Sequence, residues 1–130
     1  MANTKSKAKI VLIIEDEKPL LNAIRIKLEN SGFEVITART VDQGLHYMED
    51  VAQVDVIWLD HYLLGKGTGL DFVVAVKNND KWKKIPIFVV SNTASPDKVR
   101  SYIKFGVTKY YTKADFRLDQ IIKDMQEMLK

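Results

Sequence analysis

Five side chains that can take part in chemistry follow short apolar runs of the sequence. In chain order they are Glu15, Asp16, Asp60, Ser91 and Lys113. Clustered carboxylates raise one another's pKa unless a cation lies among them, and oxygen ligands without His or Cys suit a hard cation such as Mg²⁺. A lysine and a hydroxyl opposite the metal would hold phosphoryl oxygens. If the five side chains meet in space, they predict a phosphoryl-transfer site with Asp60 as the nucleophile.

The apolar runs themselves predict strands. They are short and rich in β-branched and aromatic residues, which is typical of parallel strands buried on both faces. We expect strands over residues 10–14, 33–38, 54–59, 85–90 and 107–112. Trp58, inside the third run, is expected in the core.

Amphipathic helices are expected between these strands. Three of them have start signals: Thr40 with Gln43 and Thr68 with Asp71 at capping-box spacing, and Ser95 before Pro96. The expected spans are 19–30, a helix after Thr40, one that runs through Val76, one from Pro96 to Gly106, and 118–129. In the fourth helix Val99, Tyr102 and Ile103 are predicted to face inward.

Strand and helix alternate five times, which predicts an α/β doubly wound parallel sheet with helices on both faces. The carboxyl ends of parallel strands share one edge of the sheet, and ligands bind beyond that edge where the strand order reverses. The five chemically competent side chains should therefore converge there.

Composition sets further bounds. The 130 residues fit one domain, carry a net charge of +3 and include no cysteine, which excludes a disulfide framework and a thiolate metal site. The first apolar run is too short for a signal peptide or membrane span, so we expect a cytoplasmic protein without a membrane partner. The basic cluster at 81–84 is interpreted as a solvated loop with Trp82 folded over the core edge, not as a nucleic-acid contact.

The order of these residues resembles that of the receiver domains of two-component response regulators. The likeness runs from Lys9 to Leu129 and rests on the five side chains above together with an aromatic, Tyr110, three positions before Lys113. It implies a flavodoxin-like fold with five helices and sheet order 2-1-3-4-5, in which the strands that carry Asp16 and Asp60 flank the switch point. It also implies a receiver domain over 9–130, a flexible segment over 1–8, and no further domain.

The resemblance implies that Asp60 accepts a phosphoryl group from a phosphohistidine on a histidine kinase or histidine phosphotransfer protein. The cofactor would be Mg²⁺, or Mn²⁺, held by Asp16, Asp60 and the backbone carbonyl of Tyr62, with Glu15 acting through water. Such a protein is a signalling phosphoacceptor in a phosphorelay and catalyses only its own phosphorylation and dephosphorylation.

The same resemblance implies a switch. Lys113 would pair with one phosphoryl oxygen, and Ser91 would bond another, drawing the loop from Asn92 to Ala94 inward and making room for the Tyr110 ring. The face formed by the fourth helix, fifth strand and fifth helix would then change and bind an unidentified downstream protein.

The sequence departs from the usual family pattern in three places. The loop from Leu63 to Gly69 lacks a proline and is one residue longer, Asn92 is larger than the usual residue, and Ala114 replaces a proline that is often cis. We expect a trans bond before Ala114, because a cis bond there costs about 2.5 to 4 kcal/mol. His46 and His61 are expected to be exposed or partly buried, and not ligands.

Two other functions fit parts of the pattern. One is a receiver-like interaction module that works without phosphate, and phosphate uptake would separate it from a phosphoacceptor. The other is an aspartyl-phosphate hydrolase, which carries a second Asp two residues after the nucleophile, where this chain has Tyr62. Turnover of a small phosphate ester would reveal such an enzyme. The alternative to any site is that the five side chains are helix caps and a surface ion pair.

Overall fold

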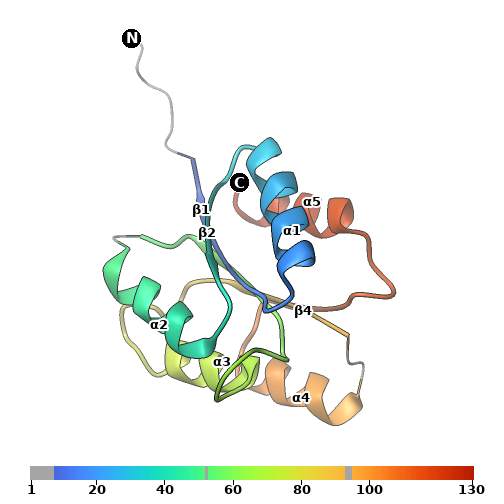
Figure 1. Cartoon of the computed structure of the whole chain (residues 1–130). Helices are drawn as coiled ribbons and strands as arrows, with labels where there is room; N and C mark the ends of the chain where they lie inside the picture. The colour runs from blue at the N-terminus through green and yellow to red at the C-terminus, as the bar shows by residue number, and fades with distance from the viewer. Residues whose placement is uncertain (1–7, 52, 93–94) are drawn as a thin grey trace.

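Five parallel strands form one sheet in the order β2-β1-β3-β4-β5 (Figure 1). The computed structural model describes residues 8–51, 53–92 and 95–130. The strands are β1 (Ile10–Ile14), β2 (Glu34–Ala38), β3 (Val56–Leu59), β4 (Ile87–Ser91) and β5 (Lys109–Thr112). The helices are α1 (Lys18–Asn30), α2 (Val41–Asp50), α3 (Gly69–Lys77), α4 (Pro96–Lys104) and α5 (Leu118–Met128). The predicted fold class and strand order are confirmed.

Helices cover both faces of the sheet (Figure 1). One hydrophobic cluster joins β1, β3 and β4 to α2, α3 and α4, and a second joins the opposite side chains of the strands to α1 and α5. Trp58 is fully buried in the second cluster, as predicted. The strands β1, β3 and β4 are buried on both faces and therefore form continuous apolar runs in the sequence, whereas the edge strands β2 and β5 are only partly buried.

Two boundaries differ from the prediction in an informative way. β4 begins after Pro86, because proline has no N–H to donate to the ladder. The same strand continues through Ser91, which pairs with Thr112, so the Ser91 side chain projects from the strand and not from the following loop. Of the predicted flexible segment 1–8, residues 1–7 lie outside the described residues, as do Thr93 and Ala94 of the loop after β4.

One residue of the predicted inner face of α4 is exposed in the structure. Tyr102 is fully buried and Val99 is partly buried, but Ile103 is 54% exposed. Successive residues of an α-helix point about 100° apart around its axis. When Tyr102 faces the sheet, Ile103 therefore faces solvent. Ile103 is therefore a surface residue.

Candidate functional site

Backbone hydrogen bonds align the carboxyl ends of the strands. The Asp60 N–H donates to the Ile14 carbonyl at 2.9 Å, and the Lys113 N–H donates to the Ser91 carbonyl at 2.8 Å. These bonds continue the parallel ladders β1–β3 and β4–β5 by one residue. The side chains that follow the strands are consequently held at one edge of the sheet.

Three carboxylates meet at that edge. Glu15, Asp16 and Asp60 each present an oxygen, and these oxygens lie within 4.8 Å of one another. Glu15 is 1% exposed and Asp60 is 4% exposed, whereas Asp16 is partly buried. Two of the three carboxylates are thus almost completely withdrawn from water, which is costly for a charge unless a cation compensates it.

Lys113 supplies a positive charge between the two buried carboxylates. Its Nζ lies 2.8 Å from Glu15 Oε1 and 3.4 Å from Asp60 Oδ2. Burial alone would lower the lysine pKa, but the hydrogen bond to Glu15 and the charge of Asp60 outweigh that effect, and the pKa of Lys113 is raised. Lys113 therefore stays charged.

One ammonium does not neutralise two buried carboxylates. Burial raises the pKa of Glu15 to about 7, and the Asp60 charge adds to this, while the hydrogen bond from Lys113 acts in the opposite direction. Burial also raises the pKa of Asp60, against the charge of Lys113 and the bond from the His61 N–H. The cluster is thus short of positive charge.

This donor set fits a magnesium ion. All three ligands are carboxylates, with no sulfur or imidazole among them, and hard divalent cations prefer such oxygen ligands. A divalent cation would also supply the missing positive charge.

Raised carboxylate pKa values predict how stability depends on pH. Folded Glu15 keeps its proton up to about pH 7, whereas an unfolded glutamate loses it near 4.5, so the folded state binds more protons in this window. Stability of the metal-free protein should fall, by about 2 kcal/mol, as pH rises from 5 to 8. Thermal unfolding at several pH values measures this. Glu15→Gln should flatten the slope, and added Mg²⁺ should restore stability at pH 8; equal slopes for both proteins would contradict the prediction.

Sequence reasoning missed Arg39, which holds Asp16 in place. Its Nη2 and Nε donate to the Asp16 carbonyl at 2.7 and 3.1 Å. Arg39 follows β2, the strand beside β1, so its backbone lies next to the acidic turn. An arginine one residue past the end of a neighbouring strand is the signal that could have indicated this contact.

Ser91 and Tyr110 lie on the neighbouring strands β4 and β5. Ser91 is fully buried. Burial raises the pKa of Tyr110, and the nearby Ser91 side chain opposes the rise. The Tyr110 ring packs on the Tyr102 ring of α4, with 5.5 Å between centroids. The two predicted switch residues therefore influence each other across the paired strands β4 and β5.

The unusual loop after Asp60 has a defined shape. Gly65 and Gly67 have φ values of +74° and +90°, a region that favours glycine. Leu64 forms an isolated parallel bridge with Thr40, which ties this loop to the start of α2.

The peptide bond before Ala114, just after β5, is trans, as predicted. No peptide bond among the described residues is cis.

His61 is buried, which contradicts the prediction that it is exposed or partly buried, and the Tyr62 side chain contacts α4. His61 is 7% exposed, its N–H donates to Asp60 Oδ1 at 2.8 Å, and its Nδ1 lies 2.5 Å from the Tyr102 hydroxyl. Tyr62 is 51% exposed and its hydroxyl accepts a hydrogen bond from Lys98 of α4 at 2.6 Å. His46, by contrast, is exposed beside Asp50, as predicted.

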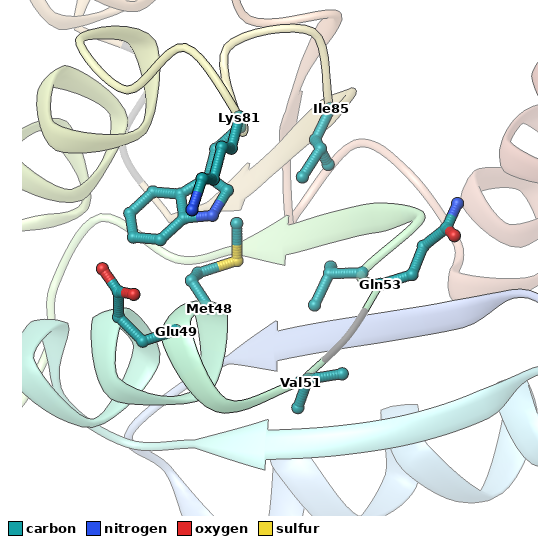
Figure 2. Close-up of a pocket in the computed structure, with 8 residues that line it drawn as sticks. Met48, Glu49, Val51, Gln53, Lys81 and Ile85 are labelled. Carbon is teal, nitrogen blue, oxygen red and sulfur yellow. The ribbon is translucent and has the colours of Figure 1, made fainter.

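A separate pocket of about 370 Å³ lies at the opposite edge of the sheet (Figure 2). Its lining comes from the end of α2, the approach to β3 and the loop before β4: Met48, Glu49, Val51, Gln53, Val54, Lys81, Trp82 and Ile85. Trp82 is partly buried and packs against the core, as predicted for the basic cluster. This pocket shares no residue with the acidic cluster.

Similarity to known proteins agrees with this geometry. Residues 11–126 match the family model described as "Response regulator receiver domain". The phosphate regulon transcriptional regulatory protein PhoB of Klebsiella pneumoniae is 30% identical over 107 residues, which cover 82% of this chain and 45% of PhoB. This chain spans about half the length of the first curated relatives that it matches. Within the part of the chain that the structure describes, no helix is long and apolar enough to cross a membrane.

Solved structures give the same result. The chemotaxis response regulator CheY4 of Vibrio cholerae is 28% identical with a TM-score of 0.81, and the alignment covers 92% of this chain and 98% of CheY4. The phosphorylated cyanobacterial phytochrome response regulator RcpA is 26% identical with a TM-score of 0.79, covering 93% and 91%. The match over nearly the whole chain, on a sheet of the same order, shows that the protein belongs to the response regulator receiver domain family.

Proposed function

We propose that this chain is a phosphoacceptor of a two-component phosphorelay, with Asp60 as the accepting residue. The observation that carries the proposal is the buried contact of Lys113 with both Glu15 and Asp60, at the carboxyl edge of β1, β3 and β5. A buried ion pair is weak evidence for stability, since an apolar replacement is often as stable. It is better explained by chemistry at Asp60.

In the proposed reaction an oxygen of Asp60 attacks the phosphorus of a phosphohistidine. The bond between phosphorus and the imidazole nitrogen breaks, the nitrogen keeps the electron pair, and an acyl phosphate forms on Asp60. The carboxylate is oriented from two sides, because the His61 N–H bonds Oδ1 and Lys113 faces Oδ2. Orientation of this kind lowers the entropic part of the barrier.

Bound Mg²⁺ would neutralise charge on the phosphoryl oxygens. The residues that would hold the ion are Asp16, Asp60 and the Tyr62 carbonyl, with Glu15 acting through water. Arg39 fixes the Asp16 backbone through its carbonyl, which limits the movement of one ligand. The solved structure of response regulator Rcp1, which is 25% identical, is described as a Mn²⁺-bound form and supports such a site.

Phosphorylation would then compete for two existing contacts. Lys113 would share its charge with a phosphoryl oxygen, and Ser91 would give up its interaction with Tyr110 to bond another phosphoryl oxygen. Shifting a two-state balance from 1:99 to 99:1 needs about 5.5 kcal/mol. A few charge-assisted hydrogen bonds of about 1.5 to 3 kcal/mol each are enough.

The proposed partners follow from this switch. The phosphodonor is a histidine kinase or phosphotransfer protein, and the target binds the face of α4, β5 and α5. Ile103 of α4 and Phe105, which follows α4, are exposed hydrophobic side chains, and Tyr110 of β5 is partly buried. A protein partner suits such side chains better than nucleic acid does. We place this activity in the cytoplasm.

The direct test is the intact mass of the protein after incubation with acetyl phosphate and Mg²⁺. We expect one added phosphoryl group in the parent protein, none in Asp60→Asn, and none without Mg²⁺. Asn keeps the size of the side chain and its capacity to accept from the His61 N–H, so the comparison isolates nucleophilicity. Absence of any adduct would favour the interaction module that works without phosphate, and continuous release of phosphate would favour a hydrolase.

A further inference from the structure

The Tyr102 hydroxyl connects three elements near Asp60. Tyr102 is fully buried in α4, and its oxygen lies 2.5 Å from His61 Nδ1 in the loop after β3. The Leu70 N–H in the first turn of α3 lies near enough to this oxygen to lower the pKa of Tyr102, against the larger effect of burial. The α3 N-terminus approaches closely, because a Cβ built on Gly69 would lie 2.7 Å from this oxygen.

Hydrogen-bond roles in this group are complementary. Burial raises the pKa of Tyr102, so the phenol keeps its proton and can donate it to an acceptor. The Tyr102 O–H can therefore donate to His61 Nδ1 in the tautomer that leaves this nitrogen unprotonated. Among the described residues no buried side-chain nitrogen or oxygen lacks a partner, so loss of this hydroxyl would leave His61 Nδ1 unsatisfied.

The contact reaches Asp60 through His61. The His61 N–H holds Asp60 Oδ1 at 2.8 Å, and the His61 ring contacts the Tyr102 ring edge-on, with 5.6 Å between centroids. The Tyr102 ring also packs against the Tyr110 ring. Tyr102 thus touches both the loop that carries Asp60 and the ring of the proposed switch.

We propose that Tyr102 is a positioning residue that locks α4 to the loop after Asp60 through His61, so that α4 responds to the state of Asp60 by a route separate from Ser91. The lock is a property of the resting protein. Its role in signalling rests on the proposed function. A buried polar contact suits such a role, because it is satisfied in one arrangement only.

The first test uses the resting protein without any phosphodonor. Hydrogen exchange is followed by mass spectrometry in segments 61–70 and 96–104, for the parent protein and for Tyr102→Phe, which removes only the hydroxyl. Losing this bond should speed exchange in both segments about tenfold. His61→Phe, which removes Nδ1 from the other end, should give the same pattern.

Tyr111→Phe is the matched control. Tyr111 is also buried, and its hydroxyl donates to Asp124 of α5 at 2.6 Å, but it packs on the opposite face of the sheet. It should leave segments 61–70 and 96–104 unchanged. Equal exchange in α4 for the two tyrosine variants would overturn the lock.

The second test adds acetyl phosphate and Mg²⁺, with the adduct confirmed by intact mass. Phosphorylation should alter exchange in α4 of the parent and of Tyr111→Phe, and this response should fall at least threefold in Tyr102→Phe. An undiminished response in Tyr102→Phe would overturn the coupling. If the parent protein takes up no phosphate, the proposed function fails, while the resting exchange still decides whether the lock exists.

Discussion

Replacing Gly69 with alanine is expected to cost about 3 kcal/mol of folding stability. A Cβ at this position would lie 2.4 Å from the Asp60 carbonyl oxygen and 3.1 Å from His61 Cα. Both are backbone atoms of the loop that carries the acceptor, and this loop is also tied to Gly69 by the bond from its N–H to the His61 carbonyl. Relief of the clash requires backbone movement, which is the expensive form of overpacking.

Gly44→Ala is the control for this substitution. Gly44 is also a buried helical glycine, but its added Cβ would meet the end of the Ile14 side chain at 2.7 Å and the Phe72 ring at 3.0 Å. Side-chain ends can shift, and alanine favours the helix by up to about 1 kcal/mol, so the net loss should be about 1 kcal/mol or less. Urea unfolding of both variants measures the difference, and a Gly69→Ala protein as stable as Gly44→Ala would contradict the predicted clash.

Lys113→Met is expected to cost about 3 kcal/mol at pH 8 in the absence of Mg²⁺. The substitution keeps an unbranched side chain and removes the ammonium between Glu15 and Asp60. Removing one partner of a buried ion pair leaves the remaining charges uncompensated, which typically costs 3 to 5 kcal/mol. The loss should shrink at pH 5, where Glu15 is protonated, and on addition of Mg²⁺, which supplies positive charge.

Lys27→Met gives the matched comparison for Lys113. The Lys27 ammonium lies 2.8 Å from Asp119, the same separation as in the Lys113–Glu15 pair, but both side chains are largely exposed. Exposed pairs contribute about 0 to 1 kcal/mol, so Lys27→Met should change stability little at either pH. Chemical denaturation at pH 5 and pH 8 tests this; similar losses for the two lysine variants would show that burial does not strengthen the Lys113 contacts.

The architecture and the place of the acidic cluster could both be predicted from the amino-acid sequence. Fully buried parallel strands appear as uninterrupted apolar runs, and a chain that alternates such runs with amphipathic helices has few ways to bury both. Because the carboxyl ends of parallel strands share an edge, residues as distant in the chain as Glu15 and Lys113 could be brought together by reasoning alone. The hydrophobic pattern of the strands and the topology of a parallel sheet are enough to predict that these residues meet.

Contacts that depend on the rotation of a helix, or on how closely two segments approach, could be found only in the folded structure. Whether Tyr102 or Ile103 faces the sheet depends on the rotation of α4, and the burial of His61 depends on that choice. The contact of Arg39 with the Asp16 carbonyl likewise depends on side-chain reach between two loops. Such contacts have no periodic signal, because each is specified by packing between segments that are separate in the chain and not by the local sequence of either.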